Sequence, residues 1–158
     1  VLFRSQMVGV TGDMEEFKTQ DNRELSDGVQ AVVDFYGPSD VTHVNDTPRD
    51  PIFTADKSKI PEDILFGGCV VDHPEIAQPG NPINYIEKDK PLPPFLIAHG
   101  DEDPMVPFNQ SVLTAQKLLE TGHTLEFYKV VGAGHGTFMW TQELVDLVIR
   151  FFKAWLAI

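Results

Sequence analysis

The stretch PFLIAHG at residues 94–100 is the clearest strand signal in this chain of 158 residues. Its apolar residues continue without interruption to a glycine, a pattern typical of strands buried on both faces of a parallel sheet. A similar run occupies residues 29–36 and ends at Gly37-Pro38, and residues 125–131 form a third. Together the runs predict an α/β protein whose parallel strands are flanked by helices.

One helix is expected between the second and third runs, beginning near Pro107 and ending at Gly122, because proline suits a first helical turn and glycine an end. Its apolar residues recur at helical spacing: Phe108, Val112, Ala115 and Leu119. After residue 140, Thr141 can cap a last helix. That helix has a broad apolar face, which we expect to pack on the sheet: Leu144, Leu147, Val148, Phe151 and Trp155.

Residues 38–93 differ from the rest of the chain, since they contain most of its prolines and show little periodicity. A long segment of this kind between two buried strands is usually functional. We therefore expect a lid-like excursion over the site. Within it, residues 60–66 predict one short helical turn after Pro61, and residues 83–86 predict the return to the sheet.

The composition excludes several classes of partner. The net charge is −12 and 42% of the residues are hydrophobic, so one domain with a real core is expected, and nucleic acid or an anionic membrane surface would be repelled. No apolar run approaches the ~20 residues of a membrane span. Cys69 is the only cysteine, which rules out an intrachain disulfide and leaves the cellular location undecided.

The chain begins with VLFRS, residues 1–5, and has no initial Met. This pentapeptide looks like the translated end of a sequencing-library adapter, so we expect a sequencing or cloning scar and exclude it from the interpretation of the fold. Residues 6–158 are then expected to form part of one domain whose natural sequence began earlier.

Two polar loops follow neighbouring predicted strands. HGDEDPMVP spans residues 99–107, and GAGHG spans residues 132–136. The carboxyl ends of parallel strands meet at one edge of a sheet, so Asp103 and His135 should lie close together. A carboxylate beside an imidazole orients the ring and stabilises the imidazolium, which is the arrangement of a general base. We expect His99 to pack or hydrogen-bond at its strand end.

These two loops, with VVDFYGPSD at residues 32–40, closely resemble the C-terminal half of α/β-hydrolase esterases of the acetyl and feruloyl esterase-like branch. The resemblance covers about residues 6–158. It implies the C-terminal portion of an α/β-hydrolase fold, a carboxylester substrate and no metal or organic cofactor. It also implies that Asp103 is the triad acid and His135 the triad base, and that Met7 to Gly12 end the helix that follows the nucleophile. Pocket-lining roles are expected for Tyr36, Met139 and Trp140.

The chain departs from this family in one respect: it contains no Gly-x-Ser-x-Gly, the elbow that presents the serine nucleophile. Ser5 has no flanking glycines and falls in the suspected scar. The chain is therefore expected to carry the acid and the base of a serine esterase without its nucleophile, and to be inactive alone. Loss of preceding strands would expose a hydrophobic sheet edge and promote self-association.

Two alternatives stay open from the sequence. A prolyl-oligopeptidase-type peptidase has similar acid and histidine loops, and a non-enzymatic binding module could retain both residues as relics. The DNA upstream of Gln6 distinguishes these, because a Gly-x-Ser-x-Gly there supports an enzyme and a propeller domain supports the peptidase.

Overall fold

Three parallel strands form the sheet in the computed structural model, which describes residues 2–56 and 60–156. They are β1 (Val32–Phe35), β2 (Phe95–Gly100) and β3 (Leu125–Val130), and β2 lies in the middle. In the register, Phe95 pairs with Val32 on one side and with Leu125 on the other. Every residue of β2 is buried, which confirms the parallel α/β sheet and its fully buried strand.

The first strand is shorter than the predicted run of residues 29–36. β2 begins opposite Val32, so residues 29–31 have no partner strand to pair with. At the other end, the Tyr36 amide still donates to the Ala98 carbonyl at 3.0 Å, but the backbone turns there with a φ of 47°. The strand therefore ends where it delivers Tyr36 to the edge of the sheet.

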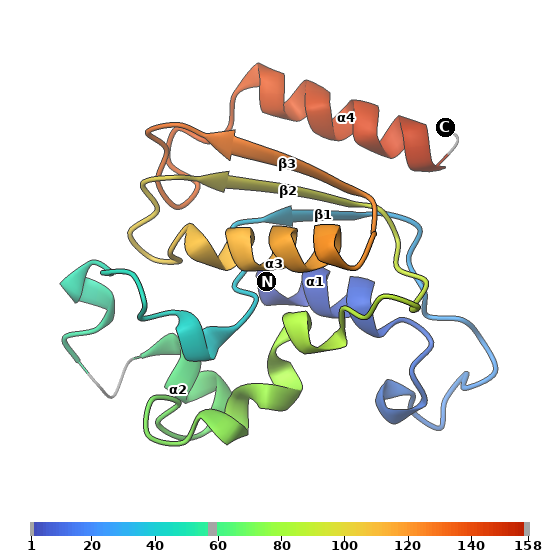
Figure 1. The fold of residues 1–158 in the computed structure, drawn as a ribbon, viewed down its shortest axis with the longest axis horizontal. Helices are drawn as coiled ribbons and strands as arrows, with labels where there is room; N and C mark the ends of the chain where they lie inside the picture. The colour runs from blue at the N-terminus through green and yellow to red at the C-terminus, as the bar shows by residue number, and fades with distance from the viewer. Residues whose placement is uncertain (1, 57–59, 157–158) are drawn as a thin grey trace.

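Helices cover both faces of the sheet (Figure 1). α1 (Leu2–Thr11) and α3 (Asn109–Glu120) lie on one face, and α4 (Gln142–Leu156) lies on the other. The core on the α1 and α3 side consists of Val10, Val32, Ile86, Phe95, Ile97 and Leu118. The core on the α4 side consists of Ala98, Ala133, Met139 and Leu144.

The buried face of α3 differs from the predicted apolar face. Leu119 is 64% exposed, whereas the helix buries a largely polar set: Gln110, Ser111, Thr114, Ala115 and Leu118. These polar side chains are buried because each has a partner elsewhere. The side-chain oxygen of Gln110 accepts the amide of Ser39, Ser111 contacts His99, and Thr114 donates to Gln6. Of the predicted apolar face, Ala115 is buried, but the prediction was wrong for Leu119.

α1 runs antiparallel to β1. Near its start, Gln6 donates to the carbonyl of Gly37, just beyond β1. Further along, Gly9 lies so close to the beginning of β1 that a Cβ there would come within 2.5 Å of the Val32 side chain. The helix therefore starts at the edge of the sheet where the strands end, and runs back along it (Figure 1).

α4 confirms the predicted cap, because the Leu144 amide donates to the Thr141 hydroxyl at 3.2 Å. Leu144 and Phe151 are buried, as predicted. Trp155, which is expected on the same face, is 44% exposed and lies outside the packed face. None of the helices in the described ranges is long and apolar enough to cross a membrane.

The segment between β1 and β2 contains the predicted helical turn, α2 (Pro61–Phe66), together with short 3₁₀ helices at Val41–His43, Pro51–Phe53, Pro74–Gly80 and Pro82–Tyr85. Another 3₁₀ helix, Glu15–Phe17, precedes β1. The segment lies on the side of α1 and α3 that faces away from the sheet (Figure 1). It contacts the loop after β2, since the Asp50 amide donates to the Pro104 carbonyl at 3.1 Å.

Candidate active site

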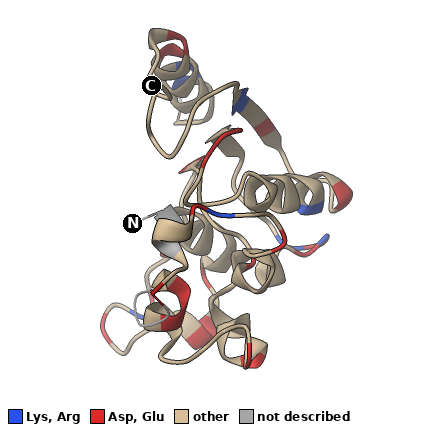
Figure 2. Cartoon of the chain, turned by 90° about the vertical axis from the view of Figure 1, so that its left-hand side faces the viewer, with Lys and Arg blue, Asp and Glu red and all other residues tan. Residues whose placement is uncertain are grey.

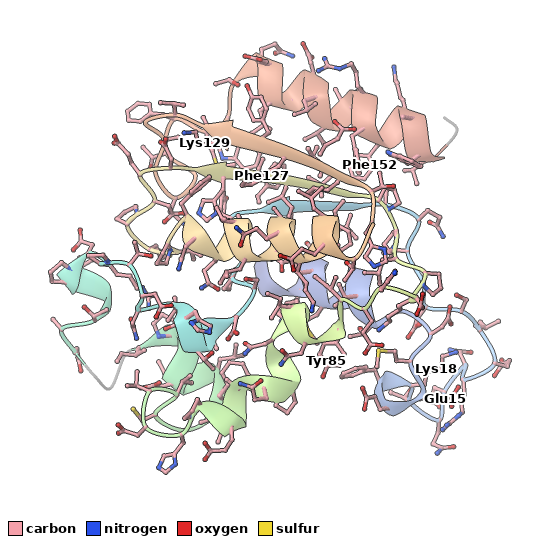
Figure 3. All side chains as sticks on the ribbon, in the orientation of Figure 1. Glu15, Lys18, Tyr85, Phe127, Lys129 and Phe152 are labelled. Carbon is pink, nitrogen blue, oxygen red and sulfur yellow. The ribbon has the colours of Figure 1, made fainter. Side chains whose placement is uncertain are left out.

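The loops after β2 and β3 touch through their backbones. Gly100 allows this contact, because a Cβ at that position would lie 2.2 Å from the Ala133 carbonyl oxygen. The Glu102 amide then donates to the same carbonyl at 3.0 Å, and the Gly132 amide donates to Asp101 at 2.7 Å. Lys129, labelled on β3 in Figure 3, pairs with Asp101 at 3.3 Å. The acidic turn at Asp101 and Glu102 thus links the two loops through hydrogen bonds and is more than a solvated surface.

Asp103 and His135 meet across these two loops. The Nδ1 atom of His135 lies 2.7 Å from Oδ2 of Asp103, which confirms the proximity predicted from the strand order. The other carboxylate oxygen, Oδ1, accepts hydrogen bonds from the amides of Met105 at 2.8 Å and Val106 at 2.9 Å. The Asp103 side chain is fully buried, whereas the His135 side chain is 19% exposed. The imidazole can therefore meet a substrate while its carboxylate stays protected from water.

Asp103 remains a carboxylate in this environment. Burial alone would raise its pKa, but hydrogen bonds from His135, His99 and the two backbone amides outweigh burial and hold the pKa well below its usual range. Figure 2 views the molecule from the side toward which the strands point. It shows Asp and Glu in red, distributed from α4 to the helices on the other face of the sheet. An ionised Asp103 requires a proton on Nδ1 of His135, which leaves Nε2 free to accept one.

The backbone around His135 adopts conformations that favour glycine. Gly132 and Gly136 have φ values of 72° and 74°, so the predicted sharp turn on each side of the histidine is present. Tyr36, also at positive φ, places its ring 4.3 Å from the imidazole, measured between ring centroids. A positive φ is unfavourable for a tyrosine, and backbone geometry of this kind is typical of functional sites.

The three expected pocket residues have different positions. Tyr36 packs beside His135, and Trp140 is 56% exposed with its ring 4.8 Å from that of Phe35. Met139 is fully buried in the core beneath α4. The expectation for Met139 is therefore corrected, since a residue with no exposed surface packs the helix and cannot contact a substrate. Sequence inspection overlooked Phe138, which is 83% exposed two residues beyond the glycine-flanked turn.

Two of the described serines have partners other than His135. Ser39 and Ser111 are fully buried and bonded to Gln110 and His99. Ser58 lies outside the described residues. Across residues 2–56 and 60–156, no cluster of three His, Cys, Asp or Glu side chains is arranged to hold a metal ion.

A second buried carboxylate lies in β1. Asp34 is fully buried, and its Oδ2 accepts a hydrogen bond from Gln6 at 2.8 Å. Its other oxygen, Oδ1, lies beside the backbone of Gly37. Burial raises the pKa of Asp34 to about 6, although the bond from Gln6 opposes the shift. Sequence inspection missed this group, because an aspartate within an apolar run carries no sign of its long-range partner.

Replacing Asp34 with Asn is expected to remove a pH dependence of stability. The folded-state pKa lies above that of an unfolded aspartate, so the folded chain binds more protons between about pH 4 and 6. The unfolding free energy of the wild type therefore falls as pH rises through this interval. Relative to the wild type, the unfolding free energy of Asp34→Asn should therefore rise by about 2 kcal/mol between pH 4 and pH 7. Urea unfolding of both proteins at several pH values measures this difference, and a pH-independent difference would contradict the assignment.

Known proteins resemble this chain over most of its length. A family model described as BD-FAE matches residues 4–118. Two curated relatives come from Mycobacterium tuberculosis: Esterase LipQ is 29% identical over 70% of the chain, and Esterase LipC is 26% identical over 84% of it. A solved structure described as a truncated form of carbohydrate esterase from gut microbiota is 30% identical, covers 96% of the chain and superimposes with a TM-score of 0.78. The chain spans 24% and 31% of the two curated relatives and 55% of that solved chain.

Proposed function

Because the chain belongs to the BD-FAE family and is similar to α/β-hydrolase esterases, we propose that it carries the acid and the base of a serine carboxylester hydrolase. The observation that carries this proposal is the contact of 2.7 Å between a fully buried Asp103 and a partly exposed His135. Such a pair is suited to accept a proton from a nucleophile and to return it to a leaving group.

In the proposed mechanism, a serine outside this sequence attacks the ester carbonyl carbon while Nε2 of His135 takes the hydroxyl proton. The tetrahedral intermediate expels the alcohol, which leaves with that proton, and an acyl-serine remains. Water, deprotonated by the same nitrogen, then releases the acid and regenerates the serine. Asp103 holds the Nδ1 proton throughout and stabilises the imidazolium.

The direction of α1 supports this arrangement. Gln6, the first residue of α1 beyond the suspected scar, lies at the edge of the sheet where β1 ends, because its side chain bonds to the Gly37 carbonyl there. A segment that enters α1 at this edge arrives near the ends of β2 and β3, from which Asp103 and His135 project. This placement suits a helix that follows a nucleophile elbow.

The proposed substrates are small acyl esters, with acetyl or feruloyl groups on polysaccharide as the favoured class. Support comes from the carbohydrate esterase that is 30% identical to the chain. Tyr36 and Trp140 supply aromatic surface at the same edge of the sheet as His135. These two residues are proposed to contact substrate.

An active-site fluorophosphonate probe tests the division of the triad. The 158-residue chain should not be labelled, because it has no Gly-x-Ser-x-Gly to present an activated serine. A version preceded by such a segment should be labelled, and His135→Ala in that version should abolish labelling. Stoichiometric labelling of the chain alone would overturn the proposal.

The outer edge of β1 is proposed to mediate self-association. β1 has a strand on one side alone in the described sheet. A groove beside it is lined by four apolar residues and two polar ones: Val8, Val29, Ala31, Val32, Arg4 and Ser5. An unpaired apolar edge favours association. Sedimentation velocity should show oligomers that increase with protein concentration, and Val8→Lys should reduce them. A monodisperse monomer at all concentrations would contradict this.

A further inference from the structure

A second histidine contacts the carboxylate of Asp103. His99, in β2, is fully buried, and its Nε2 lies 3.2 Å from Oδ2 of Asp103 and 3.1 Å from the carbonyl oxygen of Val106. Oδ2 is the same oxygen that contacts His135. On the other side of the ring, Nδ1 of His99 lies 2.7 Å from the hydroxyl of Ser111 on α3.

These neighbours determine where the proton of His99 lies. A carboxylate oxygen and a carbonyl oxygen can each accept hydrogen bonds but cannot donate one, so Nε2 must carry a proton to satisfy them. In the neutral ring, Nδ1 is then an acceptor and Ser111 donates to it. Each member of the row Ser111, His99 and Asp103 thus has a defined donor or acceptor role.

This row has the residue types of a catalytic triad, but it cannot act as one. The side chains of Ser111 and His99 are fully buried, so no ester can reach them. The rings of Phe108 and Tyr36 lie against His99, with centroids at 5.5 Å and 6.2 Å. Any effect of the row on the proposed chemistry is therefore exerted through Asp103.

The carboxylate of Asp103 is held by four donors. Oδ1 accepts two backbone amides, and Oδ2 accepts His99 and His135. The two amides and His99 belong to β2 and its loop, so they hold the carboxylate in place independently of the His135 loop. Rotation of the carboxyl group would break both sets of bonds at once.

We propose that His99 is a positioning residue that orients Asp103 toward His135, and that Ser111 holds the His99 ring in place by donating to its Nδ1. The importance of His99 for catalysis rests on the esterase function proposed above. Its geometric role does not require a nucleophile and can be measured in the chain alone.

The test is ¹H and ¹⁵N NMR of the 158-residue chain and three variants. His99→Gln retains a donor near the Nε2 position, His99→Leu retains volume without a donor, and Ser111→Ala removes the hydroxyl. The low-field Nδ1 proton of His135, hydrogen-bonded to Asp103, should be present in the wild type and in His99→Gln. It should be lost in His99→Leu, because a misoriented carboxylate no longer protects it.

Imidazole ¹⁵N shifts provide an independent measurement. In the wild type they should show His99 protonated at Nε2. In Ser111→Ala that proton should stay on Nε2, and the Nδ1 resonance should shift because Nδ1 loses its donor. A wild-type proton on Nδ1 would overturn the proposal even if His99→Leu did not fold. An unchanged His135 resonance in a folded His99→Leu would overturn it as well, since a role in stability alone leaves that resonance unaffected.

The outcomes distinguish this proposal from the esterase function. If the NMR results are as expected but the version with a Gly-x-Ser-x-Gly segment is never labelled, the esterase function fails and the orientation of Asp103 by His99 stands. If labelling occurs and the His135 resonance ignores His99, the proposal for His99 fails alone.

Discussion

Asp103→Asn is expected to lower kcat/KM about 10,000-fold in an esterase that joins this chain to a Gly-x-Ser-x-Gly segment. The reason lies in the four donors around the carboxylate. The amides of Met105 and Val106 occupy one oxygen and require an acceptor there. The amide oxygen of Asn must therefore take that position, and its NH₂ group then faces His99 and His135.

An NH₂ group opposite His135 selects the wrong tautomer of the imidazole. Nδ1 becomes an acceptor, so the proton moves to Nε2 and the ring can no longer accept the proton of the serine. Steady-state hydrolysis of an acetyl ester measures the loss. Glu102→Gln is the matched control, since Glu102 is an exposed neighbour in the same loop, and it should keep kcat/KM close to that of the parent. Retention of a tenth of the activity in Asp103→Asn would exclude Asp103 as the triad acid.

Arg49→Met is expected to lower the unfolding free energy by about 3–5 kcal/mol, because it leaves a buried carboxylate without its partner. The Arg49 side chain is 2% exposed and that of Glu62, on α2, is 11% exposed, and they form an ion pair at 3.1 Å. Arg49 also donates from Nε to the Met105 carbonyl at 2.9 Å. One guanidinium therefore connects α2 to the loop that holds Asp103.

The double variant Arg49→Met with Glu62→Leu separates two explanations of such a loss. A buried ion pair replaced by apolar residues of similar size is often neutral for stability, so the double variant should recover most of the loss. Urea unfolding of the wild type and both variants measures this. A loss below about 1 kcal/mol in the single variant is the size expected of an exposed pair, and it would show that water reaches the pair.

The parts of the site that could be predicted are those that follow from strand order. Asp103 and His135 each follow a strand with a strong local signal, and parallel neighbours end at one edge. The glycines around His135 are local too, since Gly132 and Gly136 take positive φ. The contact between Asp103 and His135 could therefore be predicted without information from distant parts of the chain.

The contacts that hold Asp103 could not be predicted in the same way. His99 is only four residues from Asp103, but its orientation depends on Ser111, whose helical face was expected to be apolar. Arg49 reaches the same loop from 56 residues away. Local periodicity reports which residues face a core, and it does not report which polar groups find partners there.

The sequence by itself determined the parallel α/β sheet, the capped last helix and the two loops that carry the proposed acid and base. These features depend on apolar runs, glycine turns and caps, which act over a few residues. Only the tertiary structure decided that Met139 is buried, that α3 buries polar side chains and that Asp34 lies against Gln6. Such outcomes depend on whether a buried polar group finds a partner, and that partner can lie anywhere in the chain.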